Sequence, residues 1–137
     1  MMLSDVRDYI ASLGISEHTY MAKSDNKKEK SIGVYASKHE QPYKKAIGGA
    51  AMESYGVKRI TMLIHWNKSY RETEMASRVL FRRIESAREV RVNETTIKFI
   101  QPIVEEPVPV DTDDNGIYEM VIEAAVIYER KGQGETE

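Results

Sequence analysis

An acidic stretch ahead of a turn is the part of this sequence that most resembles a site for chemistry. Asp111–Gly116, with the sequence DTDDNG, matches the first half of a calcium-binding loop, in which oxygen ligands alternate along the chain. The complete loop places a bidentate glutamate at its twelfth position, which here is Ile122, and Glu123 comes one residue too late. The flanking residues favour a proline-rich loop and a strand, not two helices. We therefore predict a solvated turn that binds no calcium specifically.

The other residue types that bind metals or catalyse reactions are few and scattered. The three histidines, His18, His39 and His65, have no i, i+4 spacing, and no HExxH motif is present. The chain has no cysteine, which excludes disulfides, thiolate catalysis and cysteine-based zinc sites. Gly48-Gly49 lacks the pattern of a nucleotide-binding loop. We expect no catalytic residue, no metal site, no cofactor and no enzymatic activity.

Positive charge gathers in two places. The run Lys23–Lys30 is interrupted by Asp25 and Glu29 and indicates a solvated loop tip. The alternative is a mobile arm that becomes ordered on a partner, which would involve Lys27 and Lys28. The second place is the central helix described below. Because the net charge is −2, the chain has no overall basic field, and we expect no sequence-specific binding to nucleic acid.

Length and composition fit one ordinary globular domain. The chain has 137 residues, of which 41% are hydrophobic and 31% charged. No apolar run approaches the roughly 20 residues that cross a bilayer, so we expect no membrane association. We predict a single domain over residues 1–130 and a disordered polar tail over residues 131–137.

A buried strand followed at once by an amphipathic helix organises the chain. Every second residue of Lys58–Trp66 is apolar from Ile60 onward, which is typical of a strand with one face on a core. Ser69 and Glu72 form the S-x-x-E pattern that begins helices. The apolar helical positions predicted to face the strand are Ala76, Val79, Leu80, Ile84 and Ala87.

The remaining elements frame this unit. We predict a helix over Ser4–Leu13, a hairpin of Thr19–Ala22 with Ser31–Ser37, a hairpin of Glu89–Val92 with Thr95–Ile100, and a long strand over Ile117–Arg130. Pro107 and Pro109 are expected to keep residues 105–110 extended and irregular. The fold class is therefore α+β: a mixed, mainly antiparallel sheet with two helices packed on one face and β-hairpins at the edges. The polar alternates Glu119, Glu123 and Glu129 then need water or a partner subunit.

The whole pattern resembles a known family, the tail-terminator or tail-completion proteins of long-tailed phages and prophages, which are often labelled minor capsid proteins. The matching features are the short first helix, the strand Arg59–Trp66 with its helix, the run Phe99–Ile103, and the proline-rich loop that leads into Asp113–Glu119 and the final strand. The resemblance covers residues 3 to 130.

The resemblance implies a structural function. Such proteins assemble as rings, typically hexamers and in some cases only on meeting the tail. They cap the finished tail tube and join the tail to the head. The implied partners are further copies of the chain, the tail-tube protein and a head-completion protein. The implied location is the tail or neck of the virion, with assembly in the host cytoplasm.

A ring needs two different contact surfaces on each subunit, and two surfaces of opposite charge are available. The predicted contact residues are Arg71, Arg78 and Arg82 on the central helix, Glu105, Glu106, Asp111, Asp113 and Asp114 in the acidic loop, and Lys27 and Lys28. Solvation alone also accounts for both charged surfaces. The alternative function is a small dimeric ligand-binding or regulatory domain, which a mass measurement in solution would separate from a ring.

Overall fold

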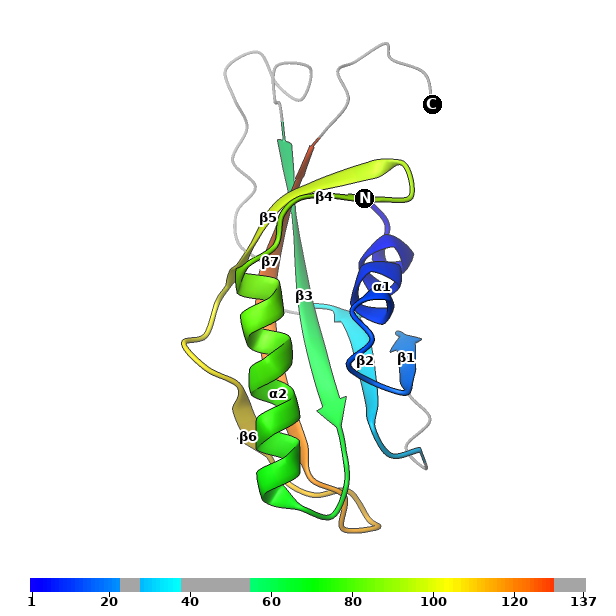
Figure 1. Ribbon diagram of the computed structural model, residues 1–137, viewed down its shortest axis with the longest axis vertical. Helices are drawn as coiled ribbons and strands as arrows, with labels where there is room; N and C mark the ends of the chain where they lie inside the picture. Colours follow the sequence, from blue (N-terminus) through cyan, green and yellow to red (C-terminus); the bar gives the residue numbers. More distant parts are fainter. Residues whose placement is uncertain (23–27, 38–54, 130–137) are drawn as a thin grey trace.

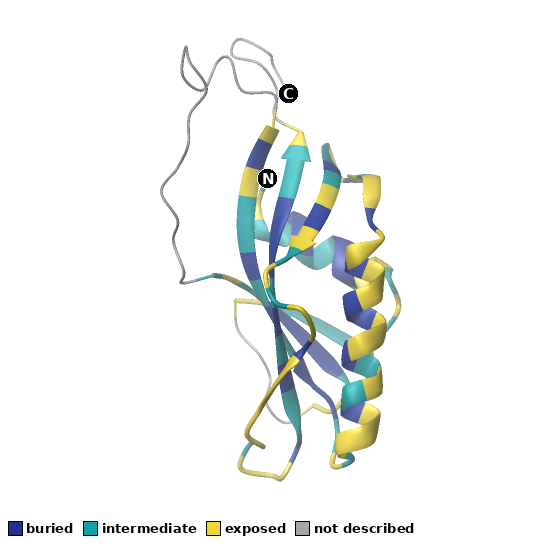
Figure 2. Ribbon diagram, turned by 90° about the vertical axis from the view of Figure 1, so that its left-hand side faces the viewer, coloured by how far each residue is buried: buried dark blue, intermediate teal, exposed yellow. Residues whose placement is uncertain are grey.

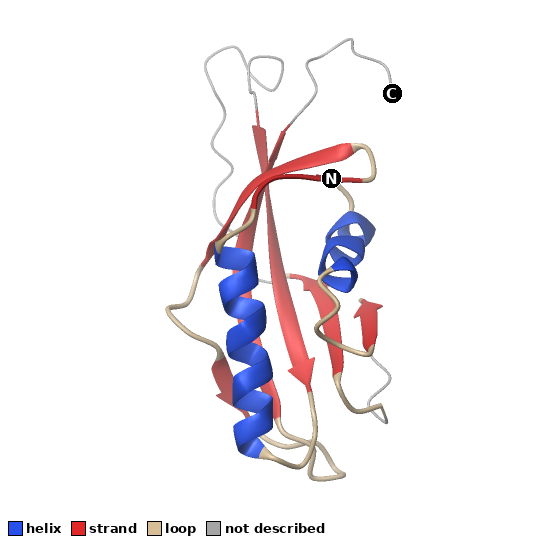
Figure 3. Ribbon diagram, viewed as in Figure 1, coloured by secondary structure: helices blue, strands red, loops and turns tan. Residues whose placement is uncertain are grey.

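The structure is a computed structural model that describes residues 1–22, 28–37 and 55–129 (Figure 1). Within these residues the chain forms two helices and one seven-stranded sheet (Figure 3). The elements in chain order are α1 (Leu3–Ser12), β1 (His18–Met21), β2 (Ser31–Ala36), β3 (Tyr55–His65), α2 (Tyr70–Glu85), β4 (Arg88–Val92), β5 (Thr95–Pro102), β6 (Val108–Val110) and β7 (Glu119–Glu129). The strand order is β1-β2-β3-β7-β5-β4, with β6 also paired to β7, and the predicted α+β class is confirmed.

The two long strands β3 and β7 form the centre of the sheet. They pair antiparallel over their whole length, from Tyr55 opposite Glu129 to His65 opposite Glu119. On β3 the side chains of Ile60, Met62 and Ile64 are fully buried, as the period-two pattern predicted. The even-numbered residues of β7 from Met120 to Val126 are buried on the same face.

Both helices cover this one face of the sheet, as predicted (Figures 1 and 2). α2 packs on β3, β5 and β7, and α1 packs on β1, β2 and β4. Val6 and Ile10 of α1 join Leu80 and Ile84 of α2 in one core with the buried strand residues. The opposite face of the sheet carries no helix from the described part of the chain (Figure 2).

The N-terminus of α2 is fixed by polar contacts from two residues. The Ser69 hydroxyl accepts a hydrogen bond from the Glu72 amide at 3.2 Å, which confirms the predicted cap. In a complete capping box the Glu72 side chain would accept a hydrogen bond from the Ser69 amide. Here the Ser69 amide donates instead to the Asn67 side-chain oxygen at 2.9 Å.

The buried stripe of α2 differs in part from the prediction. Leu80, Ile84 and Ala87 are buried as expected, but Val79 is 43% exposed, so its assignment to the core was wrong. The buried side of α2 also includes Thr73, Ser77 and Phe81, which the prediction had left out. The two polar residues tolerate burial because each hydroxyl donates to the backbone carbonyl four residues earlier, at 2.8 Å in both cases. A hydrophobicity pattern cannot detect such self-satisfied hydroxyls.

The predicted hairpin of the first two strands is wrong. β1 and β2 pair in parallel, with His18 opposite Ser31. The connection can return alongside the strands because residues 22–30 span up to about 30 Å when extended, and a four-residue strand is only about 13 Å long. Ala22 and Lys30 both have positive φ, so the chain turns sharply at each end of the connection. The second predicted hairpin is confirmed, with β4 and β5 antiparallel around Asn93-Glu94.

The proline-rich stretch also contains structure that was not predicted. Val108–Val110 forms the short strand β6, which pairs with residues 119–121 of β7. Pro109 is compatible with this position because β6 lies at the edge of the sheet, where a missing amide leaves no ladder bond unmade. The predicted disordered tail at 131–137, most of the Lys23–Lys30 run and His39 lie outside the described residues.

Candidate functional site

The side of α2 that faces away from the sheet combines arginines with exposed apolar side chains. Its members are Arg71, Met75, Arg78, Val79 and Arg82, which we call the α2 stripe. At 100° per residue these positions form one line opposite the buried Leu80 and Ile84. Met75 is 56% exposed and Val79 is 43% exposed. Arginine and methionine are enriched in protein interfaces, so this composition is typical of a contact surface. The sequence predicted the arginines of this surface. It did not predict Met75, and it wrongly assigned Val79 to the core.

The predicted acidic surface lies between β5 and β7. Glu105, Glu106, Asp111 and Asp114 are exposed, and we call them the acidic segment. It adjoins the α2 stripe within one chain, since the Arg78 guanidinium lies 3.9 Å from the Glu106 carboxylate and 3.8 Å from that of Glu74. Exposed pairs of this kind contribute at most about 1 kcal/mol, so these side chains remain free to change partners. The two predicted surfaces thus meet at Arg78 and Glu106.

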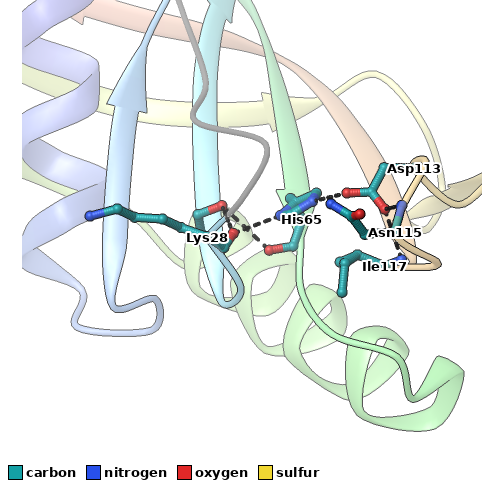
Figure 4. A network of polar contacts seen from close by, with 6 residues as sticks. Lys28, His65, Asp113, Asn115 and Ile117 are labelled. Atoms are coloured by element: carbon teal, nitrogen blue, oxygen red, sulfur yellow. Dashed lines mark hydrogen bonds and ion pairs between the residues drawn. The ribbon is translucent and has the colours of Figure 1, made fainter.

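Asp113 belongs to an internal network and not to the acidic surface (Figure 4). Its Oδ2 lies 2.6 Å from Nε2 of His65, whose side chain is only 3% exposed. Its Oδ1 accepts hydrogen bonds from the backbone amides of Asn115 and Ile117 at 2.8 and 2.9 Å. His65 Nδ1 lies 2.8 Å from the Lys28 carbonyl oxygen. The network therefore joins the segment before β2, the end of β3 and the loop before β7.

The hydrogen-bonding partners define the protonation of this pair. The Lys28 carbonyl can only accept, so His65 Nδ1 must carry a proton. Burial raises the pKa of the Asp113 carboxyl, but hydrogen bonds from His65, Ile117 and Asn115 outweigh burial and hold that pKa below its usual value. An ionised Asp113 accepts a hydrogen bond from His65 Nε2 when that nitrogen also carries a proton. The 2.6 Å contact thus links the loop before β7 to the end of β3.

This geometry leaves little scope for chemistry at the network. Both ring nitrogens of His65 already have hydrogen-bonding partners within the chain, so neither is available to a metal ion. Both Asp113 oxygens are already engaged within the chain. Residues 1–22, 28–37 and 55–129 contain no group of three or more His, Cys, Asp or Glu placed to hold a metal ion. The network fixes the shape of the loop that carries the acidic residues.

The uncovered face of the sheet is mixed in character. Its members are Thr61, Leu63, Val108, Val110, Glu119, Val121 and Glu123, which we call the open face. Val108 and Val110 are 44% and 41% exposed. Burial raises the pKa of the Glu119 carboxyl, the nearby Asp113 charge adds to this, and His65 opposes it. A partly buried carboxylate on an uncovered sheet face is unfavourable for the isolated chain.

The predicted basic contact cannot be placed in full. Lys27 lies outside the described residues, and Lys28 contributes its backbone carbonyl to His65 and to the Ser31 hydroxyl. No helix among the described residues is long and apolar enough to cross a membrane.

One comparison with known proteins identifies the chain. A family model described as bacteriophage tail terminator protein matches residues 9–130. This match runs from the second half of α1 to the residue after β7. The chain belongs to the bacteriophage tail terminator family. The resemblance stated from the sequence is therefore confirmed. No match was found among curated proteins.

Membership defines the general role of this tail terminator. It is a structural protein of the phage tail, in a family named for an assembly function and not for a reaction. The candidate functional features of this tail terminator are therefore its exposed surfaces. The α2 stripe, the acidic segment and the open face are the three candidates in the described residues.

Proposed function

We propose that this protein closes the end of the phage tail tube as a ring of identical subunits, typically six, and forms the joint between tail and head. The observation that carries the proposal is the tail terminator match over residues 9–130. The proposed partners are further copies of the chain, the tail-tube protein and a head-completion protein. The proposed location is the tail or neck of the virion, after assembly in the host cytoplasm.

The α2 stripe is the proposed surface for a neighbouring subunit. Exposed Met75 and Val79 supply apolar area, and Arg71, Arg78 and Arg82 supply charge that orients the contact. A single apolar side chain on a surface is ordinary, but two at i, i+4 between three arginines form a patch. The ring proposal gives this patch a partner.

The acidic segment is the proposed surface for the tube or for the head-completion protein. Glu106 already lies beside Arg78 of the same chain, so this part of the acidic segment is poorly placed to receive the α2 stripe of the next subunit around a ring. The His65–Asp113 pair holds the loop that carries Asp111 and Asp114. A fixed loop with exposed acids loses little conformational entropy on binding.

Inactivation of the gene in the phage that encodes this chain tests the function. We expect filled heads and unattached tails in the lysate, with no infectious particles. Purified protein added to that lysate should restore infectivity, whereas an unfolded variant such as Ile64→Asp should not. Normal, joined virions from the inactivated phage would contradict the proposal.

A further inference from the structure

Two of the three candidate surfaces in the described residues lie on opposite sides of the two layers. The α2 stripe faces outward from the helix layer, and the open face lies on the far side of the sheet (Figure 2). A closed ring requires two different surfaces on each subunit, directed at different neighbours. The acidic segment adjoins the α2 stripe, as the Arg78–Glu106 distance of 3.9 Å shows. The open face is therefore better placed than the acidic segment to meet the α2 stripe of the next subunit.

The apolar residues of the open face form a row across three strands. Val108 lies opposite Val121, and Val121 lies opposite Leu63, so their side chains are neighbours on β6, β7 and β3. Val108 is 44% exposed, and the other two are partly exposed. This row offers an apolar strip to an incoming helix.

The charges of the two surfaces are opposite in sign, and both sets of charges are spread over a similar length. On β7, Glu119 and Glu123 flank Val121 and lie about 13 Å apart along the strand. On α2, Arg71 and Arg78 flank Met75 and lie about 10 Å apart along the helix, with Arg82 about 6 Å further on. Both surfaces therefore place apolar side chains between charges, with acids on one and bases on the other.

Glu119 adds an independent argument. Burial disfavours its charged form in the isolated chain. An arginine brought by a neighbouring molecule would favour the charged form and remove that cost.

We propose that the open face binds a second copy of this chain, whose α2 stripe lies across β6, β7 and β3. This inference rests on the proposed ring and names the contact that closes it. Each subunit then receives a helix on its sheet and presents its own helix to the next subunit, so the contact repeats around the ring.

Cysteine cross-linking tests the contact directly, because the natural chain has no cysteine. Met75→Cys and Thr61→Cys are purified separately, mixed, and treated with a short bis-maleimide, with a mass tag on one variant. We expect covalent dimers that contain one copy of each variant and none from either variant alone. Chains that carry both changes should give a ladder that ends at the ring. The matched control replaces Met75→Cys with Met21→Cys, a methionine 42% exposed on β1, and should give no product.

The outcomes separate the contact from the function. Cross-linking is run on concentrated protein and on protein bound to isolated tail tubes, with the mass of the natural protein measured in parallel. Oligomers without a Met75→Cys to Thr61→Cys product overturn this contact and leave the ring intact. Dimers of Met75→Cys alone would indicate that α2 pairs with α2 of a second copy. A product between Thr61→Cys and the tube protein would assign the open face to the tube. Either result overturns the inference. A natural protein that stays monomeric on both occasions contradicts the ring itself.

Discussion

The two faces of the central strands differ although they are built from alternate residues of the same segments. On β3, Ile60, Met62 and Ile64 are fully buried beneath the helices, while Thr61 and Leu63 between them stay partly exposed. The covered face is explained by the chain's own packing. The open face keeps valines and glutamates at positions that the described chain leaves uncovered. The covered face stabilises the fold, and the open face is the one that we propose for assembly.

The largest expected effect comes from placing a charge on the covered face. Ile64→Asp or Leu80→Asp buries a carboxylate without a partner, which costs several kcal/mol, about as much as the whole stability of a small domain. We expect both variants to be unfolded by circular dichroism. Leu63→Asp, one residue away on the open face, is the matched control and should fold. If Ile64→Asp melts at the natural temperature, the two faces have been assigned wrongly.

Local periodicity was sufficient to predict most of the architecture. The alternation in β3 and the cap at Ser69 are encoded within a few residues, and both were correct. The parallel pairing of β1 with β2 was missed, because the polar residues between the two strands predict a loop but not the direction of the strand that follows it. β6 was missed because its pairing partner is β7, which follows only after the turn.

The next effect concerns the buried pair at one end of the open face. Asp113→Ala leaves the buried Nε2 of His65 and the Ile117 amide without their hydrogen-bond partner, and we expect a loss of about 2 kcal/mol in the free energy of unfolding at pH 7. Asp114→Ala, in the same turn and exposed, is the control and should change stability by about 0.5 kcal/mol or less. Equal effects of the two substitutions would show that the network does not hold the loop.

The same pair should show a defined pH dependence. The folded pKa of Asp113 is lowered, so its contribution is present above the unfolded pKa of about 3.9 and is lost as the pH falls through the folded value. The stability difference between the natural chain and Asp113→Ala should therefore shrink in acid. A difference that is constant from pH 7 to pH 2 would contradict this assignment.

A smaller effect of opposite sign is expected at Glu119. Its folded pKa is raised, so its contribution is fully present below the unfolded pKa of about 4.3 and is lost as the pH rises through the folded value. Glu119→Gln should therefore raise the melting temperature slightly at pH 7 and lose that advantage at pH 4. A lower melting temperature at pH 7 would mean that Glu119 stabilises the isolated fold.

The smallest expected signal is the response to calcium. Titration calorimetry should show no stoichiometric binding to Asp111, Asp113 and Asn115, because both Asp113 oxygens are already used within the chain. A micromolar site that Asp113→Ala abolishes would overturn this prediction.

The candidate surfaces were predicted only in part, for physical reasons. Charge is visible in a sequence, so the arginines of α2 and the acids of the loop were found. The His65–Asp113 contact joins residues 48 positions apart and has no local signal. The burial of Thr73 and Ser77 was missed because their hydroxyls are satisfied by the helix backbone, which a hydrophobicity pattern does not show. The contact between Arg78 and Glu106 joins residues 28 positions apart, so it could be found only from the folded structure.

The most direct test of the assembly account is charge reversal on the α2 stripe. Arg78→Glu with Arg82→Glu should leave the melting curve intact, because both side chains are exposed, and should block ring formation and the joining of tails to heads. Infectivity restored to a lysate that lacks the natural protein is the readout. A double variant that forms rings and completes tails as the natural protein does would contradict the account, since the α2 stripe would then not be an interface.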